Sequence, residues 1–568
     1  MTKHKILTAV AALALAAHLL MGFVFIKSAA PTYDEPVHLS SGYSYLATGK
    51  YIMNIMDHPP LSEMVSALPL LFYKPSIFSN HTYFMGALPY HYGDLFLYQN
   101  IVDAGKLLNT ARVFSFILWG AVFAFFIRLF AFKTAGFEAA AFSVAAFALL
   151  PAFISNNALV TTDAAPAAFY FASFCLGCMF ARIEPLTVTL RGHKVVQVQD
   201  NKRRYRYAAL TGLATGLAMA SKFSMFVIPP LVIGMWILHN ILEPKIRLPR
   251  LLWYAAVYLA AALLTLAVVY KFDLPLYFDG LRETFKRLDQ GRSSFIWGIH
   301  SIQGVWWYFP FALAIKTPVA ALALAFTGLA VSLSRFKKEY LWLLLPPLCY
   351  FASAMFTKVQ IGFRHIMPVM PFLAVFSGLG AAYLKEKKAL RWAFAPLAFL
   401  WLWGLARTGP YYLEYFNELA GGPKNGYKYL VDSNLDWGQG LKPLGAYLKG
   451  LGGPPVMLSY FGVAKPEYYG IKYFPLKGGL AHVEHNGTGE DVCAIKRPLL
   501  AVSATNLQGV YFPDHAVFDW LKEKKPLFSA GYSIFLYDLT GDRESLAKLA
   551  ELLDRNGLNR EADCVRLS

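Results

Sequence analysis

The chain contains a series of apolar runs that are long enough to cross a lipid bilayer. A membrane-spanning helix needs about 20 consecutive apolar residues. By this measure there are about eleven candidate spans, two of them short, at 6–27, 111–131, 137–156, 163–182, 206–221, 223–240, 251–271, 316–334, 340–357, 366–384 and 391–406. Only 15% of the 568 residues are charged, whereas a soluble domain carries about 25%. The sequence therefore predicts a polytopic α-helical membrane protein.

The basic residues give this predicted bundle an orientation. Lys and Arg cluster in short segments between the apolar runs, of which 182–206 is the densest, and cytoplasmic loops have this character under the positive-inside rule. With these segments inside, the loops 28–110 and 272–315 and everything after residue 406 lie outside. The positions of the basic residues in these cytoplasmic segments explain the net charge of +18. No nucleic-acid-binding motif accompanies it, so we expect no nucleic-acid partner.

The sequence pattern changes after residue 406. Strand-like runs at 455–461, 499–504 and 531–537 alternate with amphipathic stretches, which is typical of an α/β domain. We therefore predict two parts, a transmembrane part at 1–406 and a soluble, extracytoplasmic α/β domain at 407–568. Cys493 and Cys564 both lie in the second part, and the sequence leaves open whether they pair.

Charged and titratable residues near the spans collect on one side of the predicted membrane. Charges near membrane depth are costly and are usually retained for function. Outside the cytoplasmic loops they fall at the outer ends of spans or in the first outer loop: Asp34, Glu35, Asp57, His58, Arg112, Asp163, Lys222, Lys316, Arg364 and His365. Chance would scatter them over both faces. We interpret the set as one catalytic or binding surface.

Each of these residues also has a structural interpretation. A helix N-terminal cap is the structural alternative for Asp34 with Glu35, and also for Asp163. The structural alternative for His58-Pro59-Pro60 is a rigid turn. Each basic residue of the set could extend its charged end to the membrane surface. Their convergence at one face favours the functional interpretation, in which the cations bind an anion.

These residue types suit transfer of a group carried on a lipid phosphate. A carboxylate at the membrane boundary can take the proton of an acceptor hydroxyl, and cations can hold the phosphate and stabilise the charge that develops on it. The chain has no Walker-type or GxGxxG phosphate loop, which argues against a soluble nucleotide donor.

Several motifs resemble those of GT-C glycosyltransferases of the protein O-mannosyltransferase and aminoarabinose-transferase type. In the transmembrane part they are PTYDEPVHLSSGYSYLATGKY with DHPPL, NALVTTDAAPAAFYF, GLATGLAMASKFS, WWYFPFALAIKTP and GFRHIMPVMPFL. The later segment YFNELAGGPKNGYKYLVDSNLDWGQGLKPL is similar to the tail of a bacterial branch of this family.

This resemblance implies an enzyme of the bacterial cytoplasmic membrane. It would transfer a sugar, hexosyl or pentosyl, from a polyprenyl-phosphate-linked donor to a lipid, glycan or protein acceptor on the outer, periplasmic face, with inversion. Asp34 matches the first acidic position, the expected base, and Glu35 completes the pair. Asp163 matches a second acidic position that would help hold the acceptor or, with Asp34, a divalent metal ion.

The resemblance also assigns basic positions to the lipid phosphate. Arg112, Lys222 and Arg364 match them, and Lys316 and His58 complete the expected binding surface.

Two other functions fit a membrane protein of this kind. A transporter or flippase of lipid-linked sugars should show internal repeats and polar, broken helices near the bilayer midplane, and the sequence shows no clear repeat. A receptor or assembly factor with inactive membrane helices should tolerate substitution of Asp34. We therefore favour the enzyme.

Overall fold

The computed structural model describes residues 3–184, 186–190, 194–198, 200–387, 391–480 and 482–567. Every predicted span is helical, so the predicted helical membrane fold is confirmed. The helices that correspond to these spans are α1 (Lys3–Ser28), α6 (Ala104–Ala135), α7 (Phe137–Ala148), α8 (Pro151–Asn156), α9 (Ala164–Ala181), α10 (Asn201–Met219), α11 (Ile228–Leu242), α12 (Leu248–Val269), α15 (Val319–Ser334), α16 (Leu341–Met355), α17 (Met370–Glu386) and α18 (Arg391–Thr408). Two 3-10 turns, η2 (Phe223–Val227) and η4 (Phe363–Val369), lead into α11 and α17.

Fewer of these helices than predicted are full-length spans. Among the described residues, six helices are long and apolar enough to cross a membrane. Helices α14 (Tyr308–Lys316) and α15 are bent by 113° relative to each other, and they form a seventh span if the pair is counted as one. Helices α7, α15 and α16 have only 12, 16 and 15 residues. The predicted span 137–156 is divided into α7 and α8 within a continuous apolar run, so the sequence pattern alone does not reveal this break.

Small residues allow the closest helix contacts in the bundle. A Cβ atom at Gly328 of α15 would lie 1.9 Å from the carbonyl oxygen of Phe376 in α17, and one at Gly380 would lie 2.0 Å from that of Leu324. Gly212 of α10 approaches the backbone of Tyr258 in α12 in the same way. Lipid supplies no hydrophobic drive for helix association, so such close backbone packing stabilises the bundle.

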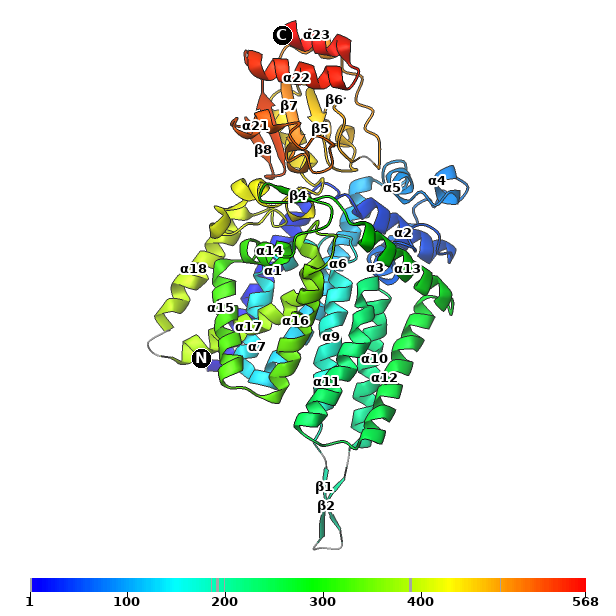
Figure 1. Ribbon diagram of the computed structural model, residues 1–568, viewed down its shortest axis with the longest axis vertical. Helices are drawn as coiled ribbons and strands as arrows, with labels where there is room; N and C mark the ends of the chain where they lie inside the picture. Colours follow the sequence, from blue (N-terminus) through cyan, green and yellow to red (C-terminus); the bar gives the residue numbers. More distant parts are fainter. Residues whose placement is uncertain are drawn as a thin grey trace.

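The predicted outer loops form a layer at one end of the bundle (Figure 1). The first loop contains α2 (Glu35–Thr48), α3 (Leu61–Ala67), η1 (Leu68–Phe72), α4 (Thr82–Met85) and α5 (Pro89–Tyr98). The second contains α13 (Leu274–Gln290), the hairpin of β3 (Ser294–Ile296) and β4 (Ile299–Ser301), and α14. At the opposite end of the bundle lies the hairpin of β1 (Leu186–Leu190) and β2 (Lys194–Val198).

The C-terminal part contains a five-stranded sheet with the order β6-β5-β7-β9-β8. Its strands are β5 (Val456–Ser459), β6 (Tyr473–Pro475), β7 (Leu499–Ser503), β8 (Phe528–Ala530) and β9 (Ile534–Asp538). Strand β5 pairs in parallel with β6 and β7, whereas β9 is antiparallel to β7 and β8. The predicted strands are thus observed as β5, β7 and β9. The predicted domain boundary at residue 406 stays a prediction.

Helices cover both faces of this sheet. Alternate strand residues pack on α19 (Leu441–Gly450) or on α22 (Arg543–Arg555), as period-two side-chain alternation requires. The remaining short elements are α20 (Ala504–Leu507), α21 (Asp519–Lys522), α23 (Asn559–Leu567) and 3-10 turns that include η9 (Val492–Ala494). Cys493 and Cys564, whose pairing the sequence left open, form a disulfide that joins η9 to α23.

Residues 432–440 form a segment, here called the junction segment, that joins the sheet to the bundle. The backbone N–H groups of Ala30 and Tyr33 donate to the carbonyl oxygens of Gln439 and Trp437, at 3.0 and 2.8 Å. Asn434 accepts from the N–H of Phe363 at 2.8 Å, which ties the same segment to η4. The sheet is therefore fixed to the end of α1 and to the start of α17.

The arrangement in Figure 1 predicts which ends of the bundle are accessible from outside the cell. The positive-inside rule places the turn between α15 and α16, which carries Lys337, in the cytoplasm. In a background with Cys349 replaced by Ser, a membrane-impermeant thiol reagent should label Lys525→Cys and not Lys337→Cys in intact cells. The reverse pattern would place the sheet inside.

A buried acid in the junction segment predicts how stability depends on pH. Burial raises the pKa of Asp436 to about 8, although the N–H of Thr505 donates to its carboxylate. The folded chain then keeps this proton at pH values where the unfolded chain has lost it. Its contribution to stability is therefore present at low pH and is lost as the pH rises from about 4 to about 8.

Asp436→Asn should flatten this pH dependence, because an amide does not titrate. The measurement is the thermal unfolding midpoint of the purified protein in nanodiscs at several pH values. Asp519→Asn, at a more exposed acid of α21, should keep the wild-type slope. An Asp436→Asn variant that also keeps it would contradict the assignment.

Candidate active site at the end of the bundle

Arg364 is the centre of the charged cluster. It lies in η4, and its side chain is only 8% exposed. One terminal nitrogen, Nη2, lies 3.1 Å from Oδ2 of Asp34, and Nη1 lies 3.3 Å from Oδ2 of Asp163. Its Nε donates to the hydroxyl of Ser433 at 3.1 Å, and the guanidinium lies 4.2 Å from the ring centroid of Trp437. Arg364 therefore fixes both predicted acids and the junction segment.

Asp34 is the more accessible of the two acids. It directly precedes α2, and its side chain is 20% exposed, whereas that of Asp163 is fully buried. The carboxylate of Asp34 contacts Arg364 through Oδ2, and within the described ranges its Oδ1 accepts no hydrogen bond. Its second oxygen is therefore available to an acceptor hydroxyl.

Asp163 and Lys222 form a closed pair behind Arg364. The ammonium group of Lys222 lies 2.6 Å from Oδ1 of Asp163, while Arg364 contacts Oδ2. Both oxygens of Asp163 are therefore occupied by cations. The structure brings Asp34, Asp163, Lys222 and Arg364 together, as expected from the sequence.

Glu35 and Arg112 form a separate buried ion pair. Arg112 donates from Nε and Nη2 to the two carboxylate oxygens of Glu35, at 2.8 and 2.5 Å, and to the carbonyl oxygens of Ala29 and Ala30. Glu35 also accepts from the N–H groups of Thr32 and Val160. Both side chains are inaccessible. This geometry suits holding the first outer loop on α6. It occupies both oxygens of Glu35 and four of the five N–H donors of Arg112.

Among the residues that the structure describes, the ammonium group of Lys316 is bound by backbone carbonyl oxygens and not by a carboxylate. The side chain is buried, and its ammonium group donates to the carbonyl oxygens of Leu413 and Asn434, at 2.8 and 2.5 Å. It thereby joins α14 to the junction segment.

His58 lies at the edge of the cluster. Its Nδ1 lies 3.2 Å from the hydroxyl of Thr162, the neighbour of Asp163, and its ring packs edge-on against His38. Burial lowers the pKa of His58 well below its usual value, with smaller contributions from His38 and Lys222. The imidazole is therefore neutral at physiological pH and suits hydrogen bonding more than anion binding.

The structure adds Arg292 to the cluster, which the sequence pattern did not indicate. It follows α13 in the second outer loop, and its Nε donates to the hydroxyl of Tyr511 at 3.2 Å. Burial alone would lower its pKa, but Tyr511 and Asp432 raise it above the usual value. Within the described ranges, no carboxylate lies within ion-pair distance of its guanidinium. The loop 272–315 was predicted to lie outside, but nothing in its sequence indicated that Arg292 would contact Tyr511.

The acids do not fit a divalent metal ion. Arg364 lies between Asp34 and Asp163, and the oxygens of Asp163 are already used by two cations. No group of three or more His, Cys, Asp or Glu side chains that could hold a metal occurs in the part of the chain that the structure describes. The arrangement instead suits general-base chemistry beside an anion site.

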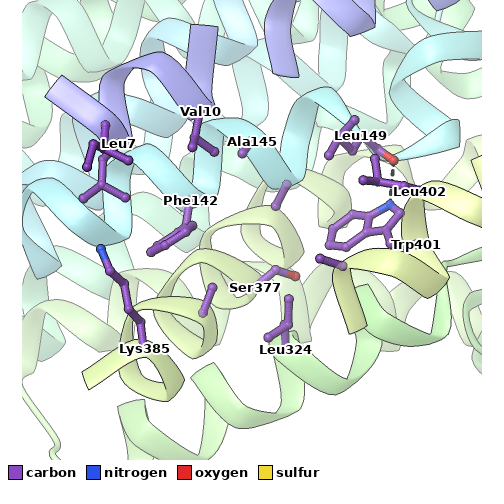
Figure 2. Close-up of a pocket in the computed structure, with 14 residues that line it drawn as sticks. Leu7, Val10, Phe142, Ala145, Leu149, Leu324, Ser377, Lys385, Trp401 and Leu402 are labelled. Atoms are coloured by element: carbon purple, nitrogen blue, oxygen red, sulfur yellow. Dashed lines mark hydrogen bonds between the residues drawn. The ribbon is translucent and has the colours of Figure 1, made fainter. Parts of the chain in front are cut away.

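A large apolar cavity lies elsewhere in the bundle, between α1, α7, α15, α17 and α18 (Figure 2). Its volume is about 450 Å³, and apolar side chains such as Leu7, Phe142 and Leu402 line it. Ser377 and Lys385 are its polar lining residues. The charged cluster does not contribute to it, so it is separate from the candidate active site.

No protein-family model and no curated protein matches the chain. Among solved structures, it is similar to ArnT from Cupriavidus metallidurans bound to undecaprenyl phosphate, with a TM-score of 0.49 and 12% identity over 93% of this chain and 97% of that one. It is also similar to the archaeal oligosaccharyltransferase AglB from Archaeoglobus fulgidus in complex with an inhibitory peptide and a dolichol-phosphate. The TM-score is 0.45 and the identity 13%, over 76% of this chain and 58% of that one.

A third similar structure is the protein O-mannosyltransferase Pmt1-Pmt2 complex of S. cerevisiae bound to the sugar donor. The TM-score is 0.32 and the identity 17%, over 50% of this chain and 34% of that one.

Proposed function

We propose that the chain is a membrane glycosyltransferase that transfers a sugar from a polyprenyl-phosphate-linked donor to an acceptor on the outer face of the cytoplasmic membrane. The observation that carries this proposal is that Asp34 and Arg292 occur at the same end of the bundle, connected through the stacked rings of Tyr33, Phe461 and Tyr511. Arg292 pairs with no carboxylate among the described residues. A lipid-linked donor carries its phosphate at the membrane boundary, where this cluster is expected.

Each group has a defined part in the proposed transfer. The open oxygen of Asp34 accepts the proton of an acceptor hydroxyl, whose oxygen attacks the anomeric carbon of the donor sugar. The bond from that carbon to the phosphate oxygen breaks, so the polyprenyl phosphate leaves with one additional negative charge. Arg292 and Arg364 stabilise this charge. A single displacement of this kind inverts the anomeric centre.

The disulfide supports the proposed location. Disulfides persist in oxidising compartments and are rare in the cytosol. The Cys493–Cys564 disulfide therefore favours a C-terminal part outside the cytoplasm, and the junction segment places the charged cluster at the same face.

Asp34→Asn should abolish transfer and leave the fold intact. Asn keeps the size of Asp but cannot take a proton, and a general base contributes roughly 10²- to 10⁴-fold. The measurement is the single-turnover rate of sugar transfer by the purified protein from a polyprenyl-phosphate-linked sugar, together with the thermal unfolding midpoint. Asp279→Asn, at an exposed acid of α13, is the matched control and should behave like the wild type. Transfer by Asp34→Asn above about a tenth of the wild-type rate would exclude the base role.

Arg292→Ala and Arg364→Ala should both impair use of the donor, but only the second should impair stability. Loss of a hydrogen bond to a charged group lowers kcat/KM for the donor by roughly ten- to a hundred-fold. Arg364→Ala also leaves Asp163 with one cation fewer, and breaking a buried ion pair costs about 3–5 kcal/mol. Donor kinetics and thermal unfolding of the two variants separate these effects.

Arg282→Ala, at an exposed cation of α13, is the control for both variants. Arg292→Lys should restore part of the activity, because an ammonium group cannot make the bidentate contact of a guanidinium. Wild-type donor kinetics in Arg292→Ala would contradict the assignment of this cation to the phosphate.

A further inference from the structure

A tyrosine of the C-terminal part connects Arg292 to a buried acid. The hydroxyl of Tyr511 accepts a hydrogen bond from Nε of Arg292 at 3.2 Å and donates one to Oδ2 of Asp432 at 2.5 Å. The guanidinium also lies 5.7 Å from the ring centroid of Tyr511. The three side chains form a chain of contacts from the second outer loop, through the sheet domain, to the junction segment.

Asp432 is held firmly at the far end of this chain. It is 6% exposed, its N–H donates to the hydroxyl of Thr505 at 3.0 Å, and its Oδ1 accepts from the N–H of Ser433 at 2.6 Å. Its φ of +54° is in the left-handed region, which non-glycine residues rarely adopt. Such a conformation persists only where its surroundings enforce it, and it is concentrated at functional sites.

The ring of Tyr511 is fixed as well. It stacks on Phe461 with a centroid distance of 5.5 Å, and Phe461 stacks on Tyr33 at 5.1 Å. Tyr33 directly precedes Asp34. A continuous set of rings therefore connects the support of Arg292 to the proposed base.

The loop that carries Arg292 is docked on the same part of the chain. The hydroxyl of Ser293 donates to the carbonyl oxygen of Val510 at 2.6 Å, and Nε2 of His300 lies 2.7 Å from that of Gln508. The N–H of Trp297 donates to Tyr429 at 2.8 Å. The position of Arg292 thus depends on the C-terminal part.

The contact with Tyr511 has a chemical consequence for Arg292. It occupies Nε and leaves Nη1 and Nη2, which together can bind two oxygens of one phosphate. Asp432 acts on Arg292 through the tyrosine hydroxyl, so the guanidinium is oriented without being neutralised by a direct ion pair.

We propose that Tyr511 and Asp432 are positioning residues that orient Arg292 toward the phosphate of the lipid-linked donor, so that the C-terminal part completes the donor site. This inference rests on the proposed function. The inference extends the proposed function, because it makes the C-terminal part necessary for recognition of the donor.

The test measures binding of two probes to the full chain in nanodiscs. The probes are undecaprenyl phosphate and undecaprenol, which differ only in the phosphate, and the readout is the ratio of their dissociation constants. The wild type should prefer the phosphate, and Arg292→Ala should reduce this preference by roughly tenfold or more. Tyr511→Phe, which keeps the ring stacking and removes the hydroxyl, should reduce it several-fold, and Asp432→Asn should have a smaller effect in the same direction.

A double mutant separates positioning from a general structural effect. If Tyr511 acts through Arg292, adding Tyr511→Phe to Arg292→Ala should cause no further loss of preference. The matched control is Tyr537→Phe, because Tyr537 is a buried tyrosine of β9 in the same C-terminal part. It should bind like the wild type.

The outcomes distinguish this inference from the proposed function. A wild-type protein that binds both probes equally would overturn the proposed function and this inference with it. Loss of preference in Arg292→Ala with full preference in Tyr511→Phe would overturn the positioning role alone. So would additive losses in the double mutant, or an equal loss in Tyr537→Phe.

Discussion

The contact of one buried guanidinium with two carboxylates organises the end of the bundle. Arg364 lies between Asp34 of the first outer loop and Asp163 at the start of α9, and it stacks on Trp437 of the junction segment. Burial of so many charges is tolerated only when each is paired and hydrogen-bonded. Any displacement of the outer loop or of the junction segment would therefore leave one of these charges without its partner, which makes the arrangement rigid.

The helical fold could be predicted from the sequence, because apolar runs of sufficient length have few alternatives in a membrane protein. The number of full spans could not, since α7 and α8 divide one continuous apolar run and α15 and α16 have only 16 and 15 residues. Strands β5, β7 and β9 were recognisable from their hydrophobic pattern, whereas β6 and β8 have three residues each. So short a strand is specified by its neighbours in the sheet more than by its own sequence.

The candidate site was predictable only in part, because the sequence shows which charges lie near a span but not which groups they contact. Asp34, Asp163, Lys222 and Arg364 were recognised because they stand next to apolar runs, and they meet in space. The same reasoning grouped Glu35, Arg112 and Lys316 with them, although these residues are engaged in local contacts. Proximity to a span does not show whether a charge has a partner. Arg292 and Tyr511 come from different parts of the chain, and only the tertiary structure brings them together.

The distribution of partners among the cations has a consequence for chemistry. Arg112, Lys222 and Arg364 each contact a carboxylate, which offsets the cost of burial but also reduces the attraction of each for a further anion. Arg292 is stabilised by a tyrosine hydroxyl and an aromatic ring, with the acid one hydrogen bond away. Its charge is therefore less compensated than the others. The phosphate site that we propose would use a cation of this kind, and in this chain Tyr511 of the C-terminal part contacts that cation.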